Sequence, residues 1–241
     1  MLTGDLRKKI IYIPCVFVLI IGAFLLVCVN AHAERTDEED EVISENDIKS
    51  AEVCILINKT HPLPEGYDFT TDKVKAKRGY LRADERAADC YAKMSNDALK
   101  EDINLIVISG YRNLDRQKTL FNKKIYSYRK NEGMSYLEAY KNSAMTVTIP
   151  GTSEHEAGLA LDIACREYTM LNEGFADTDA GKWLKDNAYK YGFILRYPKD
   201  KEYLTGIEFE PWHYRFVGKK AAKIIYDKGW TLEEYVRAYK N

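Results

Sequence analysis

The sequence predicts an α+β domain in which a small sheet is covered by helices. Three observations support this prediction: short β-branched stretches typical of strands, longer stretches with helical spacing, and N-capping signals in front of several of them. The predicted strands are few, and helices separate them along the chain. No internal repeat is present, and we therefore expect one folding unit.

Two segments precede this domain. Residues 1–33 contain a basic cluster, an apolar run from Ile10 to Val29 and a terminal small-x-small pattern, AHA. The segment predicts an export signal or, if it is not cleaved, a membrane anchor, because roughly 20 apolar residues can span a bilayer. The basic cluster stays inside, which places the rest of the chain outside the cytoplasm. Residues 34–51 are strongly acidic and predict a solvated linker.

The remaining residues, 52–241, have the composition of an ordinary globular domain that is large enough for one buried core. The net charge of the chain is −1 and no basic stripe is present, which argues against nucleic-acid binding. Cys54, Cys90 and Cys165 are the only cysteines of this part. Their odd number and the lack of a CxxC motif argue against a disulfide scaffold and a cysteine zinc site, and favour buried thiols.

The first half of the domain begins with the stretch RADERAADCYAKMSNDALKED, which has helical composition and spacing, and INLIVISG follows as a buried strand. A long helix is predicted from the N-cap Asn113 to Gly133. Ser135 and Glu138 then form the capping box of a shorter helix.

The second half continues the alternation of strands and helices. GLALDI predicts a strand, TDAGKWLKDNAYKYG a helix that ends at Gly192, and FILRYP another strand. The tail contains a helix near residues 219–227 and a last helix that begins at Thr231, where Glu234 completes a capping box.

An aspartate lies inside the apolar strand GLALDI, where a charge is costly to bury without a partner. Side chains alternate along a strand, so Asp162 shares its face only with the small residues Gly158 and Ala160. An oxygen of Asp162 can therefore project into open space, and His155 can reach the same point from the preceding turn. An ion-paired or capping aspartate is the alternative interpretation.

A second histidine, His213, follows Glu210 in the stretch FEPWHYRF. Pro211 disfavours helical geometry at Glu210, which excludes the helical zinc motif HExxH. An extended or turning segment can still present both side chains to one cavity. With His155 and Asp162, His213 would complete a zinc site with an open fourth position, and Glu210 would be the base beside it.

Several motifs resemble those of the VanY-type zinc D-alanyl-D-alanine carboxypeptidases. SEHEAGLALD is similar to the family motif SxHxxGxAxD, EPWHYRFVG resembles the second zinc motif, and SGYRNLDRQ resembles the SGYR segment with its following glutamine. The likeness covers nearly all of residues 52–241 and implies a zinc carboxypeptidase domain of the Hedgehog/DD-peptidase-like fold, with a small antiparallel sheet flanked by helices. Glu156 departs from the pattern, in which a polar uncharged residue is usual.

The resemblance also implies roles for individual residues. They are zinc binding by His155, Asp162 and His213, general base catalysis by Glu210, oxyanion stabilisation by Arg112, and substrate binding by Gln117 and Ser153. The permanent charge and fork of donors of Arg112 suit its role. A structural salt bridge is the alternative for Arg112, as are a helix-surface glutamine and a turn serine for the other two.

The implied function is removal of the C-terminal D-alanine from peptidoglycan stem peptides by an exported bacterial enzyme. An L,D-carboxypeptidase acting on the tetrapeptide and an endopeptidase cutting within the stem would keep the same residues. A third alternative is a non-catalytic zinc-binding module, as in the Hedgehog relatives of the fold. Glu210 and Arg112 argue against this last alternative, because a purely structural site needs neither.

Overall fold

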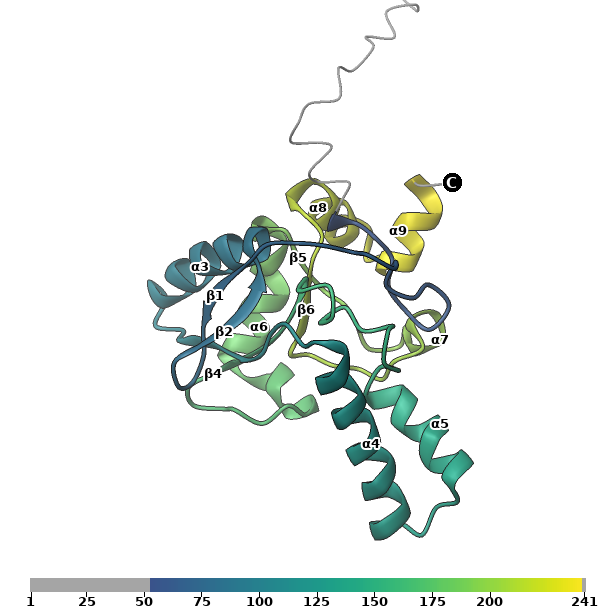
Figure 1. Ribbon diagram of the computed structural model, residues 1–241. Helices are drawn as coiled ribbons and strands as arrows, with labels where there is room; N and C mark the ends of the chain where they lie inside the picture. Colours follow the sequence, from purple (N-terminus) through teal and green to yellow (C-terminus); the bar gives the residue numbers. More distant parts are fainter. Residues whose placement is uncertain (1–52, 240–241) are drawn as a thin grey trace, which may run out of the picture. The chain divides into compact units, whose positions relative to one another are not determined.

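The computed structural model describes residues 53–239 (Figure 1). The predicted signal or anchor, residues 1–33, and the predicted linker, residues 34–51, lie outside the described residues. Among the residues that are described, no helix has both the length and the apolar character needed to cross a membrane.

The described chain forms a four-stranded antiparallel sheet, with strand order β3-β4-β6-β5, and a separate antiparallel hairpin, β1-β2. The strands are β1 (Thr71–Lys75), β2 (Tyr80–Asp84), β3 (Leu105–Ser109), β4 (Ala160–Cys165), β5 (Phe193–Leu195) and β6 (His213–Phe216). The helices are α3 (Glu85–Leu99), α4 (Leu114–Asn131), α5 (Tyr136–Thr146), α6 (Asp179–Asn187), α7 (Glu202–Thr205), α8 (Lys219–Lys228) and α9 (Leu232–Tyr239), with 3-10 turns η1 (Glu173–Asp177) and η2 (Ala188–Tyr191). The predicted α+β architecture with a small antiparallel sheet is confirmed.

Three predicted helix starts are confirmed by their capping contacts. The side chain of Asn113 accepts a backbone N–H from the first turn of α4 at 2.9 Å. Ser135 and Glu138 exchange both bonds of a capping box at the start of α5. Thr231 and Glu234 do the same at α9, with N–H to oxygen distances of 2.8 and 3.3 Å. These bonds satisfy backbone donors that have no partner inside the helix.

Other elements differ from the sequence-based expectation. The hairpin β1-β2 was not predicted, and its second strand takes up the first residues of the stretch expected to be helical. Asp84 caps α3 by accepting the backbone N–H of Arg86, so the helix begins only at Glu85. Strand β5 ends at Leu195, earlier than the FILRYP stretch suggests.

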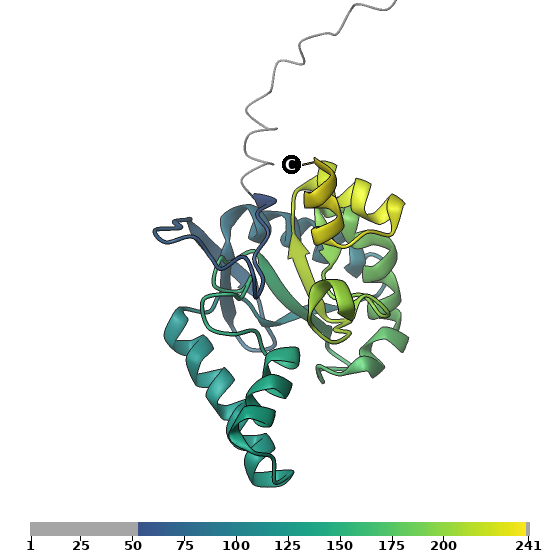
Figure 2. The same cartoon turned by 90° about the vertical axis from the view of Figure 1, so that its right-hand side faces the viewer.

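The main hydrophobic core lies between the sheet and helices α3 and α6, and it contains Tyr91 and Met94 from α3 and Leu184 from α6. Helix α8 packs on β5 at one end of the domain, while α4 and α5 pack on each other at the other end (Figures 1 and 2). Cys54 and Cys165 are buried as predicted, whereas Cys90 is only half-buried.

Candidate metal centre

The centre of the sheet carries two of the three predicted zinc ligands. Asp162 on β4 and His213 on β6 are direct partners in the antiparallel register. Their side chains therefore leave the same face of the sheet at the same level. Asp162 Oδ1 lies 3.2 Å from His213 Nδ1.

The third predicted ligand, His155, comes from the turn in front of β4. This turn is closed by a hydrogen bond from the N–H of Gly158 to the carbonyl of His155, at 3.1 Å. Gly158 has a φ of +70°, and an added Cβ would overlap the ring of Phe69 and approach the backbone nitrogen of Asp84 to 2.8 Å. Both the backbone conformation and the lack of space require glycine here.

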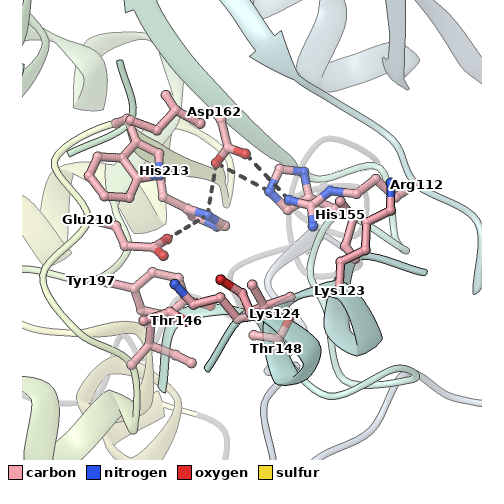
Figure 3. A pocket seen from close by; sticks show the side chains of 16 residues that line it. Arg112, Lys123, Lys124, Thr146, Thr148, His155, Asp162, Tyr197, Glu210 and His213 are labelled. Carbon is pink, nitrogen blue, oxygen red and sulfur yellow. Dashed lines mark hydrogen bonds and ion pairs between the residues drawn. The ribbon is translucent and has the colours of Figure 1, made fainter. Parts of the chain in front are cut away.

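The three side chains converge on one point, as Figure 3 shows. One potential ligand atom from each of His155, Asp162 and His213 lies within 4.8 Å of the other two, and all three residues are buried. Asp162 Oδ1 lies between the histidines, because it is also 3.3 Å from His155 Nε2. The two histidines and the aspartate form a donor set that zinc accepts.

The hydrogen bonding of His155 supports metal binding. Its Nδ1 lies 2.8 Å from the carbonyl oxygen of Gly110, which can only accept, so Nδ1 carries the proton. The lone pair is therefore on Nε2, which faces Asp162 and has no hydrogen-bond partner within residues 53–239. Burial, together with the charge of Arg112, lowers the pKa of His155 to about 4 and keeps the ring neutral. A neutral ring with a free, buried lone pair is what a metal ligand requires.

His213 has a different environment, because carboxylates surround its ring. Burial alone would lower its pKa, but Asp162, Glu154 and Glu210 outweigh burial and raise the pKa of His213 well above its usual range. In the metal-free chain a proton on His213 thus balances negative charge that a bound cation would otherwise balance.

Glu210 lies beside the candidate metal ligands but is not itself needed as a ligand. Its Oε2 is 3.3 Å from His213 Nδ1, and the turn through Pro211 is closed by the bond from the His213 N–H to the Glu210 carbonyl. Burial raises the pKa of Glu210, which makes its carboxylate a stronger base. The predicted non-helical presentation of Glu210 and His213 is confirmed.

Arg112 follows β3 and directs its guanidinium toward the other side of the centre (Figure 3). Its three nitrogens contact Ser109 Oγ at 3.1 Å, Gln117 Oε1 at 2.8 Å and Asp162 Oδ2 at 3.4 Å. The guanidinium is therefore held by polar contacts and lies next to Asp162, one of the candidate metal ligands. Arg112 also lines the cavity in front of the centre.

Gln117 and Ser153, the two predicted substrate-binding residues, are both buried and are not among the residues that line this cavity. Besides accepting from Arg112, the side chain of Gln117 donates to the carbonyl of Thr148 at 2.8 Å. Gln117 thus contacts the guanidinium of Arg112 without lining the cavity itself, and Ser153 does not line it either. Their substrate-binding roles stay predictions.

The cavity in front of the centre has a volume of about 410 Å³. Trp212 and Tyr197 form part of its wall. Lys123 and Lys124 of α4 also line it, and Figure 3 shows them across the cavity from Asp162. These lysines were not predicted from the sequence, since charged residues of a helix usually face solvent.

Glu154, which directly precedes His155 and is buried, was not predicted as part of the site either. Its Oε1 lies 2.7 Å from Arg196 Nε and 2.8 Å from Arg215 Nη1, and its Oε2 lies 3.6 Å from His213 Nε2. Burial alone would raise the pKa of Glu154, but the two arginines hold it well below its usual range. The signal in the sequence was a single arginine in each of two apolar stretches, FILRYP and HYRFVG, because a buried arginine requires an acid.

The VanY family model, described as D-alanyl-D-alanine carboxypeptidase, matches residues 80–219. YodJ of Bacillus subtilis is 43% identical over 199 residues, which cover 78% of this chain and 68% of YodJ. A D-alanyl-D-alanine carboxypeptidase of Enterococcus faecalis is 37% identical over 187 residues, which cover 77% of this chain and 66% of the relative. The chain thus spans about two thirds of the length of these relatives.

Solved structures at 36 to 42% identity share the fold. VanYB in complex with D-alanine-D-alanine has a TM-score of 0.70 at 36% identity and covers 78% of this chain and 99% of its own. A VanY D,D-pentapeptidase variant in complex with Zn(II) has a TM-score of 0.68 at 36% identity, with coverage of 76% and 98%. The L,D-carboxypeptidase LdcB has a TM-score of 0.67 at 42% identity, with coverage of 78% and 87%.

Proposed function

This chain belongs to the VanY family of D-alanyl-D-alanine carboxypeptidases, and from that membership we propose that it is a zinc-dependent D,D-carboxypeptidase. Its substrate would be a peptidoglycan stem peptide, from which it removes the C-terminal D-alanine. The observation that carries the proposal is the convergence of His155, Asp162 and His213 beside Glu210 and Arg112 at the end of one cavity.

The ligands of the zinc would be His155 Nε2, an oxygen of Asp162 and His213 Nδ1. This choice is supported by the proton on His155 Nδ1 and by the short distances from both histidines to Asp162 Oδ1. A zinc bound there supplies Lewis-acid polarisation of the peptide carbonyl and makes a water molecule more acidic.

Glu210 would carry out the proton transfers. Its carboxylate takes a proton from the water that attacks the carbonyl carbon, and returns it to the nitrogen of the leaving D-alanine as the C–N bond breaks. Two observations support this role: Glu210 is buried at the cavity wall, and its raised pKa makes it a stronger base than an exposed carboxylate.

The charge that develops on the carbonyl oxygen would be stabilised by Arg112, whose guanidinium is already held in place by Ser109, Gln117 and Asp162. Such preorganised donors need no rearrangement during the reaction. Gln117 would then contribute by keeping Arg112 in position. We retain Ser153 as a proposed substrate-binding residue on the family resemblance alone.

The cavity wall suits a peptide with a free carboxylate. Lys123 and Lys124 add positive charge to the side that faces the centre, while Trp212 and Ile207 provide apolar surface for small side chains. An anionic peptide end would be attracted by these cations and by Arg112. A substrate of this kind lies outside the cytoplasm, which agrees with the export or anchoring predicted for residues 1–33.

A second candidate function, L,D-carboxypeptidase activity on the tetrapeptide, is favoured by one observation: LdcB is 42% identical to this chain, more than either VanY structure above. Both activities would use the same metal ligands and base. They differ in the residue that precedes the cleaved bond, which is a D-residue in one case and an L-centre in the other.

The cleavage products, D-alanine or D-alaninamide and the shortened peptides, should be measured by mass spectrometry with three peptides: a pentapeptide stem, the same stem with an amidated C-terminus, and the tetrapeptide. We expect release from the free pentapeptide and none from the amidated one. Release from the tetrapeptide alone would replace the proposal by the L,D-activity. Equal cleavage of the free and the amidated pentapeptide would instead indicate an endopeptidase.

A further inference from the structure

Glu154 is next to His155 in the chain, but one oxygen of its side chain faces the ring of His213. Glu154 Oε2 and His213 Nε2 are 3.6 Å apart. Neither atom has a hydrogen-bond partner within residues 53–239, and both are buried. Two facing buried polar atoms without other partners are unusual, since such atoms are costly to leave unsatisfied.

The other oxygen of Glu154 is fixed by two guanidinium groups. Arg196 and Arg215 approach Oε1 to 2.7 and 2.8 Å, and both are fully buried. Each arginine is held in turn: Arg196 by Glu233 at 2.6 Å, and Arg215 by the backbone carbonyls of the segment that begins at Val53. The carboxylate of Glu154 is thus rigidly placed, with its second oxygen pointed at His213.

Each of the two histidines needs a hydrogen-bond acceptor for the ring nitrogen that does not face Asp162. A ring that gives one nitrogen to a metal must carry its proton on the other, and that proton needs an acceptor. For His155 the acceptor is the Gly110 carbonyl. For His213, whose Nδ1 faces Asp162, the group opposite Nε2 is the carboxylate of Glu154.

We propose that Glu154 is a positioning residue of the metal centre: it accepts the Nε2 proton of His213 and so holds the Nδ1 lone pair toward Asp162. The inference rests on the metal site of the proposed function. Glu154 itself touches neither metal nor substrate, and its effect reaches them only through His213.

The most informative substitution is Glu154→Gln. The amide keeps the shape of the side chain, but its NH₂ can donate to His213 Nε2, which favours the tautomer with the proton on Nδ1. Zinc affinity, measured by competition with a chromophoric chelator, should fall by about 10- to 100-fold. NMR of the His213 ring in the zinc-loaded protein should show the proton on Nε2 in the wild type.

Glu233→Gln is the matched control, because Glu233 contacts Nη1 and Nη2 of Arg196, whereas Glu154 contacts its Nε. It removes a charge from the same buried cluster, and the zinc affinity should stay at the wild-type level. If Glu154→Gln does not fold, Glu154→Asp keeps the charge between the arginines and withdraws the carboxylate from His213. This variant should fold, as judged by circular dichroism of the metal-free protein, and still bind zinc more weakly.

Wild-type zinc affinity in a folded Glu154→Gln or Glu154→Asp variant would overturn the inference and leave the proposed function intact. An equal loss in Glu233→Gln would also overturn it, because the effect would then belong to the buried charge cluster as a whole. A wild-type protein that binds no zinc would refute the proposed function, and the inference with it.

Discussion

Asp162 and His213 stand directly opposite each other on the neighbouring antiparallel strands β4 and β6, with Oδ1 and Nδ1 3.2 Å apart. The register of the sheet thus sets the distance between two of the three proposed metal ligands. A shift of one residue would turn His213 to the other face. The position of this pair is therefore set by the hydrogen-bonded strands of the sheet.

The first prediction concerns Glu210, which lies next to His213 but is not needed as a ligand. Glu210→Gln should keep the zinc content of the wild type and lower kcat by roughly 100-fold or more, because the amide cannot accept the proton of the attacking water. Zinc content and D-alanine release should be measured on the same preparation. Glu208→Gln, at an exposed position two residues earlier, is the control and should behave like the wild type. Near wild-type turnover of Glu210→Gln would refute the assignment of the base.

A second prediction follows from the three polar contacts of Arg112. Arg112→Lys keeps the charge but cannot reproduce the fork of donors, and we expect kcat/KM to fall by at least about tenfold while zinc is retained. Arg116→Lys is the control for the exchange, because Arg116 is exposed on the first turn of α4. An Arg112→Lys enzyme with unchanged kcat/KM would mean that the charge of Arg112 alone is sufficient.

The third prediction concerns Gln117, which is buried between Arg112 and Thr148. Gln117→Ala leaves a guanidinium N–H and a backbone carbonyl without their partner, which should lower the free energy of unfolding by about 1–3 kcal/mol and reduce kcat/KM. Gln117→Glu restores the acceptor for Arg112 but not the donor to the Thr148 carbonyl, and should recover part of kcat/KM. If Gln117 bound substrate directly, Gln117→Glu would instead repel the terminal carboxylate and be worse than Gln117→Ala.

How much of this could be predicted from the sequence depends on the range of the interactions. The caps at Asn113, Ser135 and Thr231 involve neighbours in the chain, and they were predicted correctly. Asp162 lines the cavity as expected, but the reason was only partly right: Ala160 is on β4, whereas Gly158 lies in the turn in front of the strand and not on its face. Short, polar strands such as those of β1 and β2 carry no such signal, and their pairing was missed.

Long-range partners could not be predicted in the same way. Nothing local pairs Glu154 with Arg196 and Arg215, because these contacts exist only after the sheet has formed. The orientation of Gln117 is a second example: the glutamine lies on a helix whose neighbouring residues are largely exposed, yet its side chain is turned inward to Arg112.

A fourth prediction concerns Gly158 in the turn that carries His155, with Gly66, outside this turn, as the reference. Gly66→Ala should lower the free energy of unfolding by roughly 1–2 kcal/mol, because Gly66 has a φ of +74° but open space around it. Gly158→Ala adds overlap with Phe69 to the same backbone strain, and should cost roughly 1–3 kcal/mol more. Denaturant unfolding of both variants measures the difference. Equal effects would show that the space next to Phe69 adapts to a methyl group.

The central claim is that a single zinc held by His155, Asp162 and His213 is needed for release of D-alanine. It is tested most directly by titrating the metal-free protein with zinc while D-alanine release from a pentapeptide stem is followed. The account predicts that activity rises from zero and reaches a plateau at one equivalent of zinc per chain, and that His213→Ala stays inactive throughout. D-alanine release by the metal-free protein, or by His213→Ala at the same zinc level, would contradict it.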